Sequence, residues 1–142
     1  AKMIEEIREL PETKKLIRLG LLALLVWTVG AALFLEAAAV LNSSTPAKEF
    51  INMLPYTVRL QKYDHDYCGV MSALPYKREE LRNGWTNGDL AFASDGNYFA
   101  ILYKDEEISE QYGNMVTLGK LTTDPSIMDT LDDGISVTIT LK

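Results

Sequence analysis

The feature that most constrains this sequence is a series of short alternating segments, separated by turn-forming dipeptides, in its C-terminal two-thirds. Alternation of apolar and polar residues is typical of a strand with one buried face. The first such segment is YTVRLQKY (56–63) and the last is ISVTITLK (135–142). Asn-Gly occurs at 83–84 and 87–88, and Asp-Gly at 95–96, which are dipeptides that favour tight turns. About six short strands at this spacing predict a barrel or a sandwich.

Other segments in the same region add detail to this prediction. NYFAILY (97–103) is rich in aromatic and β-branched residues and predicts a central strand, and MVTLGKL (115–121) predicts a shorter one. A short helix is expected over residues 47–53, because Ser44 or Thr45 is a suitable N-cap.

A second constraint is an uncharged run of seventeen residues, LGLLALLVWTVGAALFL (19–35), which is followed by Glu36. As a helix, residues 19–41 would be ~33 Å long, which is enough to cross the hydrocarbon core of a bilayer. Basic residues within positions 14–18 precede the run, as expected at the cytoplasmic end of a membrane helix. The sequence therefore predicts membrane attachment through residues 17–41, with the following domain outside the cytoplasm.

Three other interpretations of residues 19–41 stay open. A secretory signal peptide has the same basic start and apolar middle, and small residues at positions 37–39 suit a cleavage site. A helix packed on the domain would bury the same side chains, and such helices could hold copies of the chain in a soluble oligomer. Strands are the third interpretation, because residues 33–41 lie where a first hairpin would lie. Residues 1–18 show helical spacing, and an engineered or fused N-terminus is compatible with every alternative.

Charge and cysteine content restrict the classes of function. Residues 42–142 hold nine basic and fifteen acidic side chains, whereas residues 1–41 are neutral overall. A negative surface repels phosphate backbones, so nucleic acid is not an expected partner. Cys68 is the only cysteine, so no intramolecular disulfide can form, and we expect it to be a buried apolar residue.

Several short motifs follow one another in a distinctive order: Leu54-Pro55 after the short helix, Gly88-Asp89-Leu90 at a strand start, Gly96-Asn97 leading into Leu102-Tyr103, and Leu118-Gly119. This order resembles the cyclophilin-like domain of small bacterial proteins, over roughly residues 40–142. The resemblance implies a small closed β-barrel with one or two short helices. That family usually opens with a β-hairpin, which here is either degenerate within residues 26–41 or missing.

We therefore divide the chain into two parts. Residues 1–41 are predicted to form an N-terminal hydrophobic helical segment, and residues 42–142 a mainly β, cyclophilin-like barrel domain.

No motif for catalysis or metal binding stands out in the sequence. The segment YDHDYC (63–68) carries carboxylate, imidazole and thiol groups, but the chain has one histidine, and we interpret the segment as a polar turn. Asp89 is expected to stabilise a turn through backbone amides, and the acidic stretch at 105–110 to be a solvated surface. We predict no cofactor, no metal and no catalytic residue.

The predicted function is a non-enzymatic accessory domain that binds a small molecule or a peptide. Prolyl isomerase activity is not expected, because the isomerase cyclophilins use an arginine with aromatic, glutamine and histidine neighbours, and no such run occurs here. A binding groove would be lined where strands and turns converge, by Tyr56, Trp85, Asn97 and Tyr103. The alternatives are a hydrolase or isomerase that uses His65 or Asp89, and a soluble oligomer held by the N-terminal segment.

Overall fold

The N-terminal apolar run forms strands in the computed structural model, which describes residues 15–24 and 32–142. β1 (Lys15–Leu24) and β2 (Ala32–Leu41) pair antiparallel along their full length. The prediction of a helical segment over residues 19–41 is therefore wrong for the described part of that segment. No helix among the described residues is both long and apolar enough to cross a bilayer.

Two consequences follow for the N-terminal predictions. The helical spacing predicted for the start of the chain falls mostly on residues 1–14, which lie outside the described residues together with 25–31. Membrane attachment through residues 17–41 and an extracytoplasmic location were inferred from a helix, and they stay predictions without that support.

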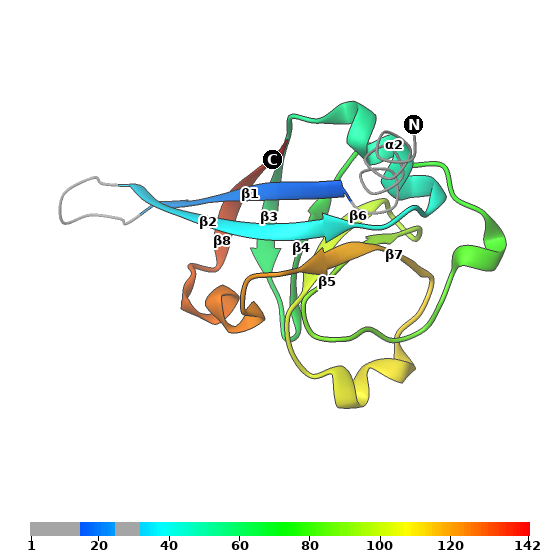
Figure 1. Cartoon of the computed structure of the whole chain (residues 1–142). Helices are drawn as coiled ribbons and strands as arrows, with labels where there is room; N and C mark the ends of the chain where they lie inside the picture. The colour runs from blue at the N-terminus through cyan, green and yellow to red at the C-terminus, as the bar shows by residue number, and fades with distance from the viewer. Residues whose placement is uncertain (1–14, 25–31) are drawn as a thin grey trace, which may run out of the picture.

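The eight strands close into one antiparallel barrel (Figure 1). Around the barrel they follow the order β1-β2-β7-β5-β6-β4-β3-β8, and β8 pairs with β1 to complete the ring. The predicted small closed β-barrel is confirmed. The hairpin that the resemblance implied is present as β1–β2, but its first strand is Lys15–Leu24 and so lies outside residues 26–41, where the hairpin was expected. The remaining strands are β3 (Tyr56–Lys62), β4 (Asp66–Val70), β5 (Asp89–Ala93), β6 (Tyr98–Leu102), β7 (Met115–Leu121) and β8 (Gly134–Leu141).

The hairpin belongs to the barrel because alternate side chains point inward. Ile17, Leu19 and Leu21 are fully buried, and their partners in the hydrophobic core include alternate residues of β8, Ile135, Val137 and Ile139. Side chains that alternate in this way on paired strands are the ordinary way to fill a small barrel. Burial of these apolar side chains stabilises the strands over the helix that local propensity favours.

One end of the barrel is covered by α2 (Thr45–Met53), the predicted short helix. Ser44 caps it, with the side-chain oxygen accepting a hydrogen bond from the Ala47 N–H at 3.4 Å. Phe50 is fully buried, and its ring stacks on Phe99 of β6 with a centroid distance of 5.7 Å. The apolar face of α2 thus completes the core at this end.

The connections between strands carry the predicted turns and three short 3₁₀ helices. The helices are η1 (Arg78–Glu80), η2 (Glu106–Gln111) and η3 (Pro125–Thr130). The Asp95-Gly96 turn joins β5 to β6, with Gly96 at φ 99° and Asn97 at φ 59°, and confirms the predicted hairpin. Gly84 and Gly88 have φ values of 79° and 101°. Asn87-Gly88 is a turn, closed by the Asp89 N–H to Thr86 carbonyl hydrogen bond at 3.0 Å, whereas Asn83-Gly84 is a bend whose Gly84 N–H donates to the distant Tyr112 carbonyl. Both glycines lie in the segment that builds the candidate site.

Candidate functional site

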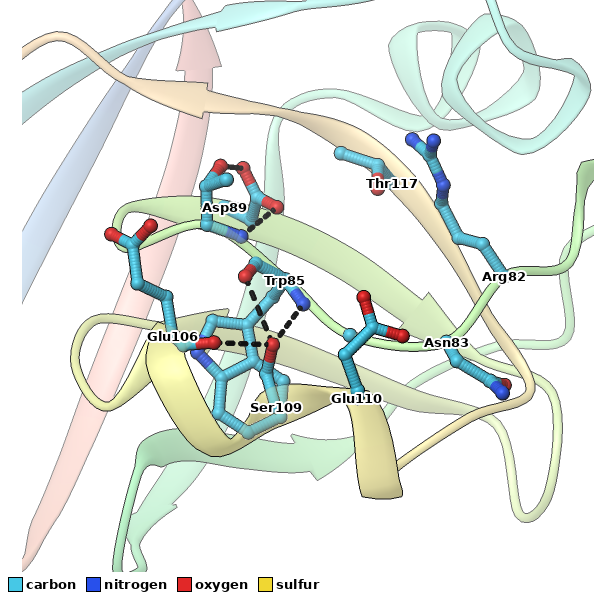
Figure 2. A pocket seen from close by; sticks show the side chains of 10 residues that line it. Arg82, Asn83, Trp85, Asp89, Glu106, Ser109, Glu110 and Thr117 are labelled. Atoms are coloured by element: carbon cyan, nitrogen blue, oxygen red, sulfur yellow. Dashed lines mark hydrogen bonds between the residues drawn. The ribbon is translucent and has the colours of Figure 1, made fainter.

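A polar groove runs along the outside of the barrel between β7, the 82–89 segment and η2. It consists of two adjoining hollows of about 330 and 400 Å³, both of which are lined by Arg82 and Thr117. Figure 2 shows the first hollow, with η2 on one side and Thr117 of β7 on the other. The first hollow is also lined by Asn83, Gly84, Trp85, Thr86, Asp89, Glu106, Ser109 and Glu110. The second is also lined by Asn42, Ser44, Glu79, Glu80, Leu81 and Val116.

Backbone hydrogen bonds fix the 82–89 segment against its neighbours. Arg82 forms an isolated bridge with Met115 at the start of β7, with N···O distances of 2.9 and 3.3 Å. The Gly84 N–H donates to the Tyr112 carbonyl at 2.8 Å, at the end of η2. The groove wall is therefore tied to the barrel on one side and to η2 on the other.

Ser109 links the wall to η2 and is buried while doing so. Its hydroxyl oxygen accepts a hydrogen bond from the Trp85 N–H at 3.0 Å, and the Glu106 carbonyl lies 2.8 Å away as an acceptor. The Trp85 indole N–H donates to the Lys104 carbonyl at 2.9 Å, which fixes the ring beneath the hollow. Ser109 thus holds the groove walls together, and the acceptors of its hydroxyl proton are backbone carbonyls rather than a basic side chain that would activate a nucleophile.

Asp89 is the buried carboxylate of the groove, and both of its oxygens form hydrogen bonds within the groove wall. It accepts hydrogen bonds from the N–H and the hydroxyl of Thr86 at 2.9 and 3.0 Å. The Lys120 ammonium lies 3.5 Å from the same carboxylate and compensates its charge. The prediction that Asp89 stabilises a turn through a backbone amide is confirmed.

Three charged side chains of the groove remain available to a ligand. The side chains of Arg82, Glu79 and Glu110 have no hydrogen bond or ion pair with any described residue, and all three are exposed. Glu80, by contrast, accepts hydrogen bonds from the N–H groups of Thr45 and Lys77, both at 2.8 Å. The groove thus has one positive charge, from Arg82, and one free carboxylate in each hollow, from Glu110 and Glu79.

Beside the groove, His65 forms a cluster that sequence analysis did not anticipate. Its Nδ1 lies 2.7 Å from the Asp105 carboxylate, and its Nε2 lies 3.4 Å from the Tyr112 hydroxyl. The His65 ring also contacts Trp85, with a centroid distance of 5.7 Å. The predicted polar turn between strands is confirmed, because His65 connects β3 to β4. Asp105, expected to be solvated, instead orients the imidazole from 40 residues away.

In the rest of the YDHDYC segment, burial disfavours the charged forms of Asp66 and Cys68 by raising the pKa of both groups. Burial raises the pKa of the Cys68 thiol to about 12, and the neighbouring Asp66 carboxyl raises it further in the same direction. Burial also raises the pKa of Asp66. Since the thiolate is the nucleophile and the metal-binding form, Cys68 is held in its unreactive form. No group of three or more His, Cys, Asp and Glu side chains that could hold a metal ion occurs within residues 15–24 and 32–142.

The structure does not bring the four predicted ligand-binding residues together in one site, and of the four only Trp85 lines the groove. Tyr56 and Asn97 hold the segment after β4, because the Tyr56 hydroxyl accepts from Ser72 N–H at 3.1 Å and the Asn97 carbonyl accepts from Met71 N–H at 2.8 Å.

Tyr103 is buried in the core, next to the Lys104 carbonyl that binds the Trp85 indole. Direct ligand contact by Tyr56, Asn97 and Tyr103 stays a prediction.

Comparison with known proteins agrees with this architecture. Residues 35–140 match the Cyclophilin-like family. The chain belongs to this family. The predicted resemblance over residues 40–142 is thereby confirmed, and the family match extends into β2. No curated protein matches the chain.

Among solved structures, the cyclophilin-like chain is similar to the hypothetical protein AF2241 from Archaeoglobus fulgidus, determined in solution. The two share 14% sequence identity with a TM-score of 0.62, over 92% of this chain and 98% of the other. At this level of identity the likeness shows a common fold. Function must therefore be argued from the groove.

Proposed function

We propose that this cyclophilin-like chain is a non-enzymatic binding domain whose ligand is an extended peptide held in the groove around Arg82. The observation that carries the proposal is how the polar groups of the groove are used. The side chains of Asp89 and Ser109 form hydrogen bonds within the groove walls, whereas the Arg82 guanidinium has no partner among the described residues. Free charged groups along a preformed groove recognise a ligand without supplying a nucleophile.

The shape and charge of the groove support an extended ligand. Two hollows that share Arg82 and Thr117 make a longer site than either hollow alone. Glu110 lies in one hollow and Glu79 in the other, with Arg82 common to both. A peptide that places an acidic side chain between two basic ones would match this order, because each charge would meet its opposite.

Two capped peptides test the proposal, Ala-Lys-Glu-Lys-Ala and Ala-Glu-Lys-Glu-Ala, in which every charge has the opposite sign. Trp85 serves as the reporter in a Trp27→Phe chain, in which it is the only tryptophan. We expect the Lys-Glu-Lys peptide to change Trp85 fluorescence and to bind at least about tenfold more tightly than its reverse, since tenfold corresponds to about 1.4 kcal/mol.

Matched arginine variants give the control for this experiment. Arg82→Ala should weaken binding of the Lys-Glu-Lys peptide at least about tenfold, because it removes a charged partner. Arg59→Ala removes an exposed arginine on β3 that does not line the groove, and it should leave the affinity unchanged. Equal affinity for both peptides, or equal effects of the two arginine variants, would contradict the proposal.

A second candidate function is a hydrolase or isomerase that uses His65 as a general base. The specific observation in its favour is the 2.7 Å contact of Asp105 with Nδ1, which orients the imidazole as in known catalytic dyads. Hydrolysis of p-nitrophenyl esters that disappears in His65→Gln, with the fold retained, would support this alternative. Prolyl isomerisation of a standard tetrapeptide belongs in the same panel, and we expect none.

A further inference from the structure

The outer edge of β2 is covered over only part of its length. β7 pairs with residues 39–41, and β1 pairs with the other edge over all ten residues of β2. Ala38 meets the chain after β7, where its N–H donates to the Thr123 hydroxyl and its carbonyl accepts from Thr122 N–H, both at 2.9 Å. Among the described residues, no strand pairs with residues 32–37 on that side. Figure 1 shows this part of the hairpin projecting beyond the barrel.

Alternation along the strand shows which backbone groups face this open edge. In an antiparallel ladder, the N–H and C=O of successive residues point alternately to the two neighbouring strands. Ala38 faces outward, because its partners are Thr122 and Thr123. The N–H and C=O groups of residues 36, 34 and 32 therefore point to the open edge as well, and those of residues 37, 35 and 33 point to β1. Three consecutive outward residues form a row of donors and acceptors that another strand could pair with.

Residues 32–37 lack most of the features that usually protect a sheet edge from pairing with another strand. Edge strands are commonly protected by lysine, proline, bulges or short length. Residues 32–37 read ALFLEA, with Glu36 as the only charge. The Glu36 carboxylate lies 3.1 Å from Arg18 Nε, so the charge is neutralised within the chain. The chain carries a net charge of −6, and this edge is a place where a second acidic copy would meet little repulsion.

We propose that the open edge of β2 pairs antiparallel with the same edge of a second copy, around a two-fold axis at Phe34. A two-fold interface needs a surface that complements itself, and an antiparallel strand edge has this property. With the axis at Phe34, residue 32 of each copy lies opposite residue 36 of the other. All three outward residues are then paired, and the two Glu36 carboxylates are kept apart. The partner is thus a second copy of this chain, held through backbone hydrogen bonds.

Sedimentation equilibrium of the full chain between 5 and 200 µM (about a forty-fold range) tests this pairing. We expect a reversible dimer. Glu36→Pro removes an outward N–H but none of the bonds to β1, because residue 36 faces away from β1. It should weaken dimerisation at least about tenfold. Glu36→Ala is the matched control, since it loses the same ion pair with Arg18 but keeps the N–H, and it should dimerise like the natural chain.

A cross-linking experiment covers the case in which Glu36→Pro fails to fold. In a Cys68→Ser chain, Phe34→Cys places one thiol at the proposed two-fold axis, where directly opposed hydrogen-bonded residues have a Cα–Cα distance of about 5.5 Å. Mild oxidation should give a covalent dimer with this variant. Ile108→Cys, at an exposed position on η2, should give none under the same conditions.

Three results would overturn the proposal. They are a monomer at every concentration, a dimer that Glu36→Pro and Glu36→Ala affect equally, and cross-linking of Phe34→Cys that is no faster than that of Ile108→Cys.

Discussion

Tyr67 and Tyr103 lie side by side in the core, with ring centroids 5.9 Å apart, yet their hydroxyl groups have different surroundings. The Tyr67 hydroxyl donates to the carbonyls of Leu131 and Asp132 at 3.0 and 2.6 Å. The Tyr103 hydroxyl is buried with no hydrogen-bond partner among the described residues. A buried hydrogen bond stabilises a fold modestly, whereas a buried polar group without a partner destabilises it.

We predict opposite effects when each hydroxyl is removed. Tyr67→Phe should lower the free energy of unfolding by about 1–3 kcal/mol, because the hydroxyl proton shared between the two carbonyls is lost and the Leu131 carbonyl is then buried without this donor. Tyr103→Phe should leave it unchanged or raise it by about 1 kcal/mol, because no bond is lost. Urea unfolding of both variants gives the comparison, and a larger loss of stability in Tyr103→Phe than in Tyr67→Phe would contradict it.

Comparison of Tyr103→Phe with the natural chain also tests how stability depends on pH. Burial raises the pKa of Tyr103 to about 12, with Asp129 as the next cause. An unfolded tyrosine ionises near a pH of about 10, so the folded chain keeps a proton that the unfolded chain loses. The stabilising effect of this proton is complete below about pH 10 and is lost as the pH rises toward 12. Tyr103→Phe should therefore show a shallower loss of stability than the natural chain between those values.

At the scale of elements, the close approach of β7 to β2 requires a glycine. A Cβ atom on Gly119 would collide with the Val40 carbonyl oxygen and lie 2.9 Å from Leu41 Cα. Both obstacles are backbone atoms of the neighbouring strand, so neither can move without shifting the ladder. The need for glycine here comes from strand spacing, since Gly119 pairs directly with Leu41.

Gly119→Ala should accordingly lower the free energy of unfolding by about 1–3 kcal/mol, the range of overpacked cores. Gly134→Ala is the control, because its Cβ would meet Arg59 Nη2 at 3.5 Å and Gln61 Oε1 at 3.7 Å, which are ordinary contacts. That variant should be neutral or gain about 0.4–1 kcal/mol from the stiffer unfolded chain. Chemical unfolding of the two variants decides the point, and similar losses in both would show that strand spacing is not the cause.

Elements differed in how well their sequence predicted them. β8 was predicted because buried Ile135, Val137 and Ile139 alternate with polar residues. For β1–β2 the sequence favoured a helix and left strands as an alternative at residues 33–41, because outward positions such as Leu16, which is 52% exposed, hide the alternation. Glu36, which follows the uncharged run in the sequence, is an exposed strand residue that forms an ion pair with Arg18. Pairing with distant strands decides such a segment, and local spacing does not show it.

The groove was harder to predict than the barrel for a related reason. Its walls come from four separate parts of the chain, near residues 42–44, 79–89, 106–110 and 116–117. Trp85 was predicted because it lies where the sequence indicates that strands and turns converge. Arg82 carries no local signal, and its role depends on the bridge to Met115 and on the empty space beside it.

At the scale of the whole molecule, the hairpin is the part that closes the barrel. β1 and β2 stand between β8 and β7, so without them these two strands would become open edges. The hairpin also contributes fully buried side chains to the core, among them Ile17, Leu19 and Leu41. The family match begins at residue 35 and so contains only part of this hairpin.

The last prediction follows from this closure and tests the division of the chain at residue 42. A fragment of residues 42–142 should fail to fold, because it exposes two strand edges and a core that lacks one wall. We expect a poorly dispersed amide spectrum and no cooperative unfolding in urea. Adding a peptide of residues 15–41 should restore both, whereas a peptide of the same composition in scrambled order should restore neither. If the fragment alone unfolds at the same urea midpoint as the full chain, the hairpin is not needed to complete the fold, and the prediction is wrong.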